Sequence, residues 1–313
     1  MFTCFNLCGF GNHLKQIRKS FGYTQEDVRR LSGINPDTLR NIENGKVIPR
    51  FDTLEYLSLI YKKDLLNDLR HYRNSNTYLQ YYSRLSNLIL NYNLDTLRNL
   101  KNDWDEFVES QKTEDTLLNA SMKEQFALVL EGITLYNSEK SKASLRCFVD
   151  AVKMTNSFFD LDKFTSLKYS YFELRILLLI SLSLAKKNNF QKSNNILSEC
   201  LNQSNFDFEA TFNEKLLITL IYFNLSYNSH KLNFYDKSLS YAKLGIEHSN
   251  KNHISYSLAP LLYRKGIAEY LLCLDNYKDT LNFSISLLLI TDRKKLAALY
   301  AKKALDVYGI VLT

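Results

Sequence analysis

Residues 23–46 read YTQEDVRRLSGINPDTLRNIENGK, and this stretch predicts two short helices joined by a tight turn. Thr24 followed three residues later by Asp27 is close to a capping box, which begins a helix. Gly33 ends that helix, because glycine adopts a positive φ at little steric cost. Asn35 caps a second helix that has proline at its first position, where the missing N–H costs nothing.

Apolar residues at helical spacing surround this pair and supply a core. Residues 52–55 form another capping box and predict a further helix. The residues expected to face inward are Leu14, Ile17, Phe21, Val28, Leu31, Ile34, Leu39, Ile42, Leu54, Leu57 and Ile60. Two short helices joined by a glycine-containing turn inside a small helical bundle are typical of a helix-turn-helix, whose second helix enters the major groove of DNA.

The second helix of the pair, residues 36–44, is the predicted recognition helix. Its apolar residues face the core, so its polar residues are left to reach base edges. Side chains at the helix starts can contact phosphates or steady this helix, and nearby cations can neutralise the DNA backbone. The predicted DNA-contacting residues are Arg18, Thr24, Gln25, Asn35, Asp37, Thr38, Arg40, Asn41, Asn44, Lys46 and Arg50.

The same residues carry a resemblance to a known family. Residues 11–69 resemble the Cro/cI-type (XRE) helix-turn-helix, and several fixed spacings agree at once. The matching positions are residues 17–18, 23–28, 32–34, 38–46, 49 and 53–54. Arg29 departs from the pattern, because the family usually has a small alanine there; a long arginine must extend to solvent. The alternative is a plain helical cap on a larger helical protein.

Glycine and proline are scarce in this chain of 313 residues, which has only nine and three of them. Average usage is about 7% glycine and 5% proline, and β-sandwiches and nucleotide-binding folds need both kinds of turn. We therefore expect an all-α protein. Two of the three prolines, Pro36 and Pro49, lie in the first fifty residues, and only Pro260 follows. This unevenness predicts a DNA-binding domain at residues 1–70 and a second domain at 71–313 made of long helices with few sharp turns.

Small residues recur twelve positions apart in the second domain. The pairs are Gly132/Ser144, Ser181/Ser193, Ser226/Ser238 and Ala268/Thr280, and a weaker copy of the pattern covers residues 85–104. An aromatic residue three positions before the second member begins three of the predicted second helices: Phe190, Tyr235 and Tyr277. Small residues allow two helices to pack closely.

This pattern resembles a degenerate tetratricopeptide repeat (TPR). The anchors at 144, 193, 238 and 280 lie 49, 45 and 42 residues apart rather than about 34. The resemblance implies a right-handed superhelix of TPR-like helical hairpins with a concave inner surface. Residues 292–308 have Leu296, Leu299 and Ala304 on one stripe, which suits a terminal cap or a dimer contact.

An XRE helix-turn-helix followed by about 240 residues of TPR-like helices resembles the Rgg/PlcR/PrgX-type (RRNPP) peptide-sensing regulators of Gram-positive bacteria. The resemblance covers essentially the whole chain. It implies a homodimer on a palindromic operator in double-stranded DNA. It also implies a short secreted and re-imported signalling peptide in the concave groove, which shifts the dimer between two arrangements by binding one more tightly.

An extended peptide exposes backbone amides, to which asparagine side chains can both donate and accept. On the predicted inner helices, the candidate peptide-binding residues are Tyr171, Arg175, Asn224, Tyr227, Asn228, Lys265 and Glu269. Residues 174–184 are expected to form the buried core of one repeat rather than a ligand site.

Motifs of the common enzyme classes are missing from the sequence. It has no Walker loop, no zinc-protease motif and no nucleophile elbow. Its five histidines are scattered, and His248 and His253 are five apart, which is the wrong spacing for one helix face. We expect no enzyme activity, no metal and no cofactor.

Five widely spread cysteines fit reduced thiols of the cytosol better than a disulfide framework. The N-terminus does not read as a signal peptide, and the apolar run 176–185 is shorter than the ~20 residues of a membrane span. The net charge of +7 permits contact with a polyanion. We expect a cytoplasmic protein without a membrane partner.

Two other functions fit the same pattern. The helical array can be a TPR-like scaffold for protein–protein interactions, with the small domain serving only to tether it. Alternatively, the protein is a constitutive dimeric repressor that senses no peptide.

Overall fold

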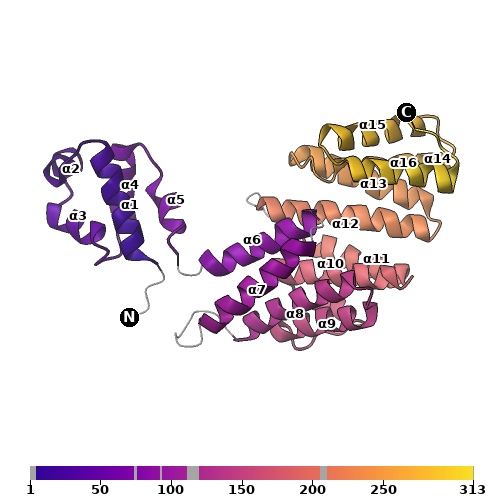
Figure 1. Ribbon diagram of the computed structural model, residues 1–313, viewed down its shortest axis with the longest axis horizontal. Coiled ribbons are helices and arrows are strands. Elements are labelled where there is room, and N and C mark those ends of the chain that lie inside the picture. The colour runs from indigo at the N-terminus through magenta and orange to yellow at the C-terminus, as the bar shows by residue number, and fades with distance from the viewer. Residues whose placement is uncertain (1–4, 74–75, 92–93, 111–119, 205–209, 313) are drawn as a thin grey trace. The chain divides into compact units, whose positions relative to one another are not determined.

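The computed structural model describes residues 5–73, 76–91, 94–110, 120–204 and 210–312. These residues form sixteen α-helices, together with one isolated β-bridge between Phe5 and Arg73 (Figure 1). The chain divides into two units, residues 1–117 and 118–313. None of the helices described is long and apolar enough to span a membrane.

Five short helices build the first part of unit 1. They are α1 (Leu7–Ser20), α2 (Gln25–Ser32), α3 (Pro36–Glu43), α4 (Phe51–Tyr61) and α5 (Leu65–Arg70). Their common core consists of Phe10, Leu14, Val28, Leu39, Ile42, Leu54, Leu57, Tyr61 and Leu65, with Ile17, Ile34 and Ile60 packed at its edge. The helices α6 (Asn76–Asn91) and α7 (Leu94–Ser110) pack on each other, and the ring centroids of Tyr81 and Trp104 lie 5.2 Å apart.

The predicted helix signals around the turn are confirmed. The backbone N–H of Asp27 donates to Thr24 Oγ1 (3.1 Å), and the backbone N–H of Thr24 donates to Asp27 Oδ2 (2.9 Å). Gly33 ends α2 with a φ of 74°. Asn35 Oδ1 accepts from the backbone N–H of Asp37 at 2.9 Å, so it caps α3. The sequence therefore places this turn correctly.

Three details of the first unit differ from expectation. Leu31 is 58% exposed, because Ile34 in the turn takes the position against the core. Phe21 is 46% exposed, since it follows the end of α1. The helix α4 begins at Phe51 without a side-chain cap, so Asp52 lies in its first turn, where a carboxylate favours the helix dipole.

Unit 2 contains nine α-helices in the described residues. They are α8 (Ala120–Asn137), α9 (Ser141–Thr155), α10 (Tyr171–Lys186), α11 (Phe190–Gln203), α12 (Phe212–Lys231), α13 (Tyr235–Lys251), α14 (Leu258–Leu271), α15 (Tyr277–Ile290) and α16 (Lys294–Tyr308). Consecutive helices pair as hairpins, and the hairpins stack in chain order from magenta to yellow (Figure 1). The predicted array of TPR-like hairpins is confirmed.

The first helices of the hairpins, α8, α10, α12 and α14, also pack on one another. Contacts between successive second helices are sparser among the described residues. Rows of helices that lie closer together belong to the inside of a curved stack. The first helices therefore line the concave side.

Three of the four pairs of small residues twelve positions apart connect the two helices of a hairpin by hydrogen bonds. Ser193 Oγ donates to the carbonyl oxygen of Ser181 at 2.9 Å, and Ser226 and Ser238 exchange such bonds at 2.8 and 2.9 Å. Ser144 Oγ donates to the carbonyl oxygen of Gly132 at 2.8 Å. These hydroxyls bond the backbone of the partner helix, which the sequence alone did not reveal.

Other expectations for unit 2 have mixed outcomes. The second helices α11, α13 and α15 begin at Phe190, Tyr235 and Tyr277 as predicted, and residues 174–184 are almost wholly buried. Leu299 of α16 is 45% exposed, so the predicted apolar stripe is only partly covered.

The turns between helices are sharp, contrary to expectation. Non-glycine residues take the left-handed conformation there: Glu139, Asn188, Asn233, His253, Cys273 and Asp292 have φ values of 55–62°. The scarcity of glycine therefore does not reflect a lack of tight turns.

Within the described residues, no group of three or more metal-binding side chains lies close enough to hold a metal ion. Cys8, Cys147, Cys200 and Cys273 are free thiols. Cys4 lies outside the described residues.

Candidate DNA-binding surface and inner groove

The helix α3 separates an apolar face from a polar face. Leu39, Ile42 and Glu43 are at most 2% exposed. The polar residues expected to reach base edges lie on the other side, where Asn41 is partly buried and the rest are exposed: Asp37, Thr38, Arg40 and Asn44. Such a face can enter a major groove without disturbing the core of the domain.

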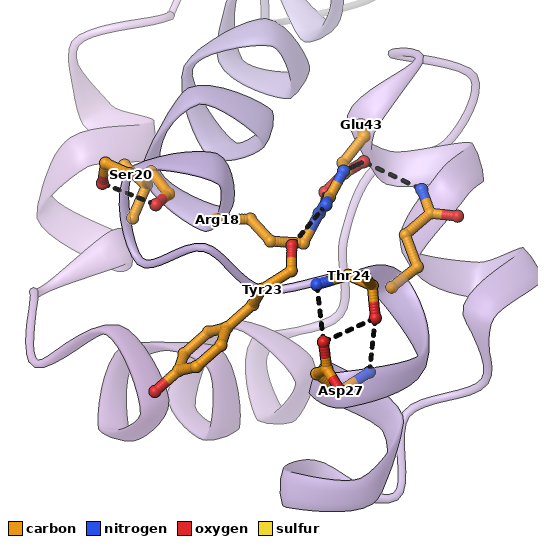
Figure 2. Close-up of polar contacts among 8 residues, drawn as sticks. Arg18, Ser20, Tyr23, Thr24, Asp27 and Glu43 are labelled. Carbon is orange, nitrogen blue, oxygen red and sulfur yellow. Dashed lines mark hydrogen bonds and ion pairs between the residues drawn. The ribbon is translucent and has the colours of Figure 1, made fainter.

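A buried ion pair connects α1 to α3. Arg18 Nε donates to Glu43 Oε1 at 2.6 Å and Arg18 Nη2 donates to Glu43 Oε2 at 2.9 Å, a bidentate arrangement. Arg18 Nη1 also donates to the carbonyl oxygen of Tyr23 at 2.7 Å. The hydrogen bond to Glu43 is the main cause that raises the pKa of Arg18. Figure 2 shows the Arg18 side chain directed at Glu43.

Gln25 adds a third element to this contact. Its Nε2 donates to Glu43 Oε2 at 2.9 Å, so the carboxylate of Glu43 accepts from both α1 and α2. The carboxylate therefore holds the recognition helix against its two neighbours. This agrees with the predicted steadying role of Gln25.

The expected role of Arg18 as a charge that neutralises the DNA backbone is wrong. Its side chain is only 9% exposed, and its donors are occupied within the domain. Sequence reasoning also gave Glu43 no role, although it falls within the motif. The sequence offered one signal for this contact: a basic residue, Arg18, in the first helix and an acidic residue, Glu43, at the end of the recognition helix.

The remaining predicted DNA contacts lie around the polar face of α3. Lys46 and Arg50 are exposed, while the side-chain oxygens of Thr24 and Asn35 serve as helix caps. Arg40 forms an ion pair with Asp37, but both side chains are more than half exposed. Such a pair contributes little and can open for another partner.

Of the peptide-binding residues predicted on α10, Arg175 is buried and Tyr171 is partly buried. Tyr171 donates its hydroxyl to the carbonyl oxygen of Asn213 at 2.8 Å, and burial raises the pKa of Tyr171 to about 12. Arg175 is 6% exposed, and burial lowers its pKa to about 10.

Two asparagines on α12 have different surroundings. Asn224 Nδ2 donates to the carbonyl oxygen of Leu220 in its own helix at 2.7 Å. Asn228 is 1% exposed, and its Nδ2 donates to Ser193 Oγ at 2.8 Å, while its buried Oδ1 has no partner. Asn228 is therefore buried against α11 and keeps one unused acceptor.

The candidates on α14 form a local pair. Lys265 Nζ lies 3.3 Å from Glu269 Oε1, and Glu269 is 5% exposed with a buried Oε2 that has no partner. Lys265 also lines an open depression of about 500 Å³ between α13 and α14. Tyr227 on α12 lies beside Phe190 and Arg264.

Comparison with protein families matches residues 14–66 to the helix-turn-helix family. Comparison with curated proteins gives no match. Among solved structures, the chain is similar to PlcR of Bacillus thuringiensis in complex with the peptide PapR7 and DNA, with 17% identity and a TM-score of 0.65 over 92% of this chain and 98% of PlcR.

Two further solved structures have the same architecture. The SHP pheromone receptor Rgg2 of Streptococcus dysgalactiae matches with 13% identity and a TM-score of 0.58, over 94% of this chain and 97% of Rgg2. ComR of S. thermophilus, in complex with DNA and its signalling peptide ComS, matches with 14% identity and a TM-score of 0.56, over 95% of this chain and 98% of ComR. The chain therefore carries an N-terminal helix-turn-helix domain and has, over more than nine-tenths of its length, the fold of the PlcR- and Rgg-type regulators that its sequence resembles.

Proposed function

We propose that the protein is a sequence-specific DNA-binding transcription regulator in the cytoplasm, controlled by a short signalling peptide. Residues 1–70 bind DNA, and residues 71–313 bind the peptide and form a homodimer. The dimer recognises a palindromic operator, because a two-fold protein dimer reads two matching half-sites.

The polar face of α3 is the observation that carries the DNA-binding part of this proposal. Five side chains able to pair with base edges lie on this short helix or at its C-cap, namely Asp37, Thr38, Arg40, Asn41 and, at the cap, Asn44. On the buried side of that helix, the carboxylate of Glu43 accepts hydrogen bonds from Arg18 and Gln25 and holds the helix in place. A rigid helix with a free polar face is what base readout requires.

The peptide-binding part is supported by the fold and by the inner helices. PlcR and ComR, which share this fold, were solved with both DNA and a peptide. Here the first helices of the hairpins carry the partly buried polar side chains Tyr227 and Lys265, and buried polar atoms without partners on Asn228 and Glu269. A ligand with backbone amides can satisfy such atoms.

The DNA-binding part is tested by selecting sites from a random double-stranded DNA library with the full-length protein. We expect enrichment of a palindrome, and a complex in which two chains bind one site by light scattering. Binding of the selected site should weaken with rising salt and exceed that of a shuffled site by at least about a thousandfold. Equal affinity for the two sites would exclude the regulator and favour the scaffold.

The peptide is tested separately on the selected site. A pool of randomised heptapeptides, added to the protein, should change its affinity for the site, because a ligand that prefers one arrangement shifts the population. An affinity that no peptide in the pool changes would favour the dimeric repressor that senses no peptide.

A further inference from the structure

Side chains from three helices of the array meet around Arg264. We use the name Arg264 cluster for Tyr227 and His230 of α12, Tyr263 and Arg264 of α14, and Tyr308 of α16. The guanidinium carbon of Arg264 lies 5.5 Å from the ring centroid of Tyr227 and 5.2 Å from that of Tyr263. Tyr308 OH lies 3.1 Å from His230 Nε2. The α12 and α14 members belong to helices that line the concave side.

The guanidinium of Arg264 is held in place but makes no polar bond. Two aromatic rings flank it, and no hydrogen bond or ion pair within the described chain reaches any of its nitrogens. Its Nε is buried and has no partner. Arginine presents five donors in a fixed fork, and leaving a buried donor unpaired is costly.

Two other arginines show that this state is not general in the protein. Arg293 lies over the ring of Tyr256 at 4.3 Å and also donates from Nη1 to the carbonyl oxygen of Tyr256 at 2.8 Å. Arg18 uses three of its donors within its domain. Arg264 is stacked like Arg293 but has no acceptor.

The surroundings of Arg264 favour an anion. His230 Nδ1 and Tyr263 OH are also buried without partners, and Lys231 lies 5.7 Å from the Tyr227 ring. Arg264 and Lys231 thus lie 5.5 and 5.7 Å from the same Tyr227 ring, and the ion pairs formed by the described residues give neither cation a carboxylate. An acceptor with negative charge would suit the unpaired Nε and the two cations.

We propose that the Arg264 cluster is a subsite for a carboxylate of the bound peptide. This inference rests on the proposed peptide-sensing function. The planar fork of Arg264 matches the two oxygens of a carboxylate, and the tyrosine rings cover the apolar part of the residue that carries it. Both the C-terminal carboxylate and an acidic side chain supply this chemistry, and the two sources are separated by experiment.

The main test uses full-length protein and acetylated randomised heptapeptides, prepared as C-terminal acids and as C-terminal amides. Peptides that co-elute with the protein are identified by mass spectrometry. If the terminal carboxylate binds, acids should be retained about tenfold better than amides, as expected for a charge-assisted hydrogen bond. If an acidic side chain binds, the amides retained should carry Asp or Glu at one position.

Three variants connect either preference to the cluster. Arg264→Gln should abolish the preference for carboxylates while peptides are still retained, and Arg264→Lys should restore part of it, because lysine keeps the charge but loses the fork. Arg146→Gln removes an 85% exposed arginine of the same unit and should change nothing. Peptide retention without any carboxylate preference, or a preference that persists in Arg264→Gln, would overturn the subsite and leave peptide sensing intact.

If no peptide is retained, peptide sensing itself is excluded. A second measurement then tests whether the Arg264 cluster binds a carboxylate. N-acetyl-leucine is titrated into full-length protein labelled with ¹⁵N-arginine, with N-acetylleucinamide as the uncharged probe. The Nε–H resonance that is missing from Arg264→Gln should shift with the acid and stay in place with the amide. An equal response to both probes, or to neither, would refute the carboxylate subsite.

Discussion

Arg18 Nε lies 2.6 Å from Glu43 Oε1, so a residue near the end of α1 and the last residue of α3 form one buried contact. The pair is 25 residues apart in sequence and contains no group that can reach DNA from the exposed side of α3. It nevertheless decides how the recognition helix is oriented.

Removing one partner of this pair should destabilise the helix-turn-helix domain. Glu43→Ala leaves the guanidinium of Arg18 buried without its carboxylate, which costs about 3–5 kcal/mol. Urea unfolding followed by circular dichroism measures the change. Asp103→Ala, which breaks the half-exposed pair with Arg84, is the control and should cost less than about 1 kcal/mol. Equal losses in the two variants would contradict a buried role for Glu43.

Arg40 should contribute to the choice of DNA sequence. Arg40→Ala is expected to weaken binding to the selected operator by about 1–3 kcal/mol and to relax the preference at one base position. Fluorescence anisotropy on the operator and its single-base variants measures both effects. Lys46→Ala should instead weaken all sites equally and reduce the salt dependence. If Arg40→Ala behaves like the distant variant Arg146→Ala, α3 is not the recognition helix.

Gly132 should not tolerate a larger side chain. A Cβ at this position would lie 2.5 Å from Cε1 of Phe148, so Gly132→Ala forces the packed ring to move and should cost about 1–3 kcal/mol. Thermal unfolding measures the loss. In the double variant Gly132→Ala/Phe148→Leu the shorter side chain makes room, and the total loss should be smaller than the sum of the single ones. Strict additivity would contradict the steric explanation.

Replacing Cys273 with glycine should stabilise the protein. It has a φ of 56° in the turn between α14 and α15, a conformation that costs an L-residue about 1–2 kcal/mol and costs glycine little. Cys273→Gly is therefore expected to raise the midpoint of thermal unfolding. The matched control Cys147→Gly changes a residue inside α9. It should lower the free energy of unfolding by about 1 kcal/mol and therefore lower the midpoint.

Stability should fall in mildly acidic solution because of His230. Burial, with Arg264 and Lys231 nearby, lowers its pKa to about 4, whereas the unfolded value is 6.5. The unfolded state therefore binds the proton first, so the stability from neutral His230 is complete above pH 6.5 and declines as the pH falls toward 4. His248, whose pKa is also lowered by burial, acts in the same direction.

Urea unfolding at several pH values between 4 and 7 tests this dependence. His230→Gln should reduce the slope of stability against pH, and His253→Gln, an exposed histidine, should leave it unchanged. The opposite result, a slope that His230→Gln leaves intact, would assign the dependence to other groups.

Local signals were the part of the fold that the sequence could predict. The cap formed by Thr24 and Asp27, the left-handed Gly33 and the burial of Leu39 and Ile42 each depend on residues a few positions apart. The twelve-residue spacing of small side chains likewise depends on one hairpin. In each case the pattern and the physical cause lie within the same short segment.

Contacts between distant segments could not be predicted in the same way. Nothing near Arg18 in the sequence shows that it pairs with Glu43, 25 residues further on. The charge of Arg18 was therefore predicted to lie on the DNA-facing surface. Arg175 was expected in an open groove, yet neighbouring helices bury it to 6% exposure. The Arg264 cluster needs α12, α14 and α16 together, and no spacing within one helix reveals it.

The hydroxyl-to-carbonyl bonds inside the hairpins have a consequence for how the chain acquires its structure. Each bond closes a loop of only twelve residues, as from Ser181 to Ser193, so the chain entropy lost on closure is small. Low contact order of this kind favours fast formation of each hairpin. The array can therefore assemble from whichever hairpin forms first, adding neighbours one by one, and it can lose its terminal hairpin without unfolding the rest.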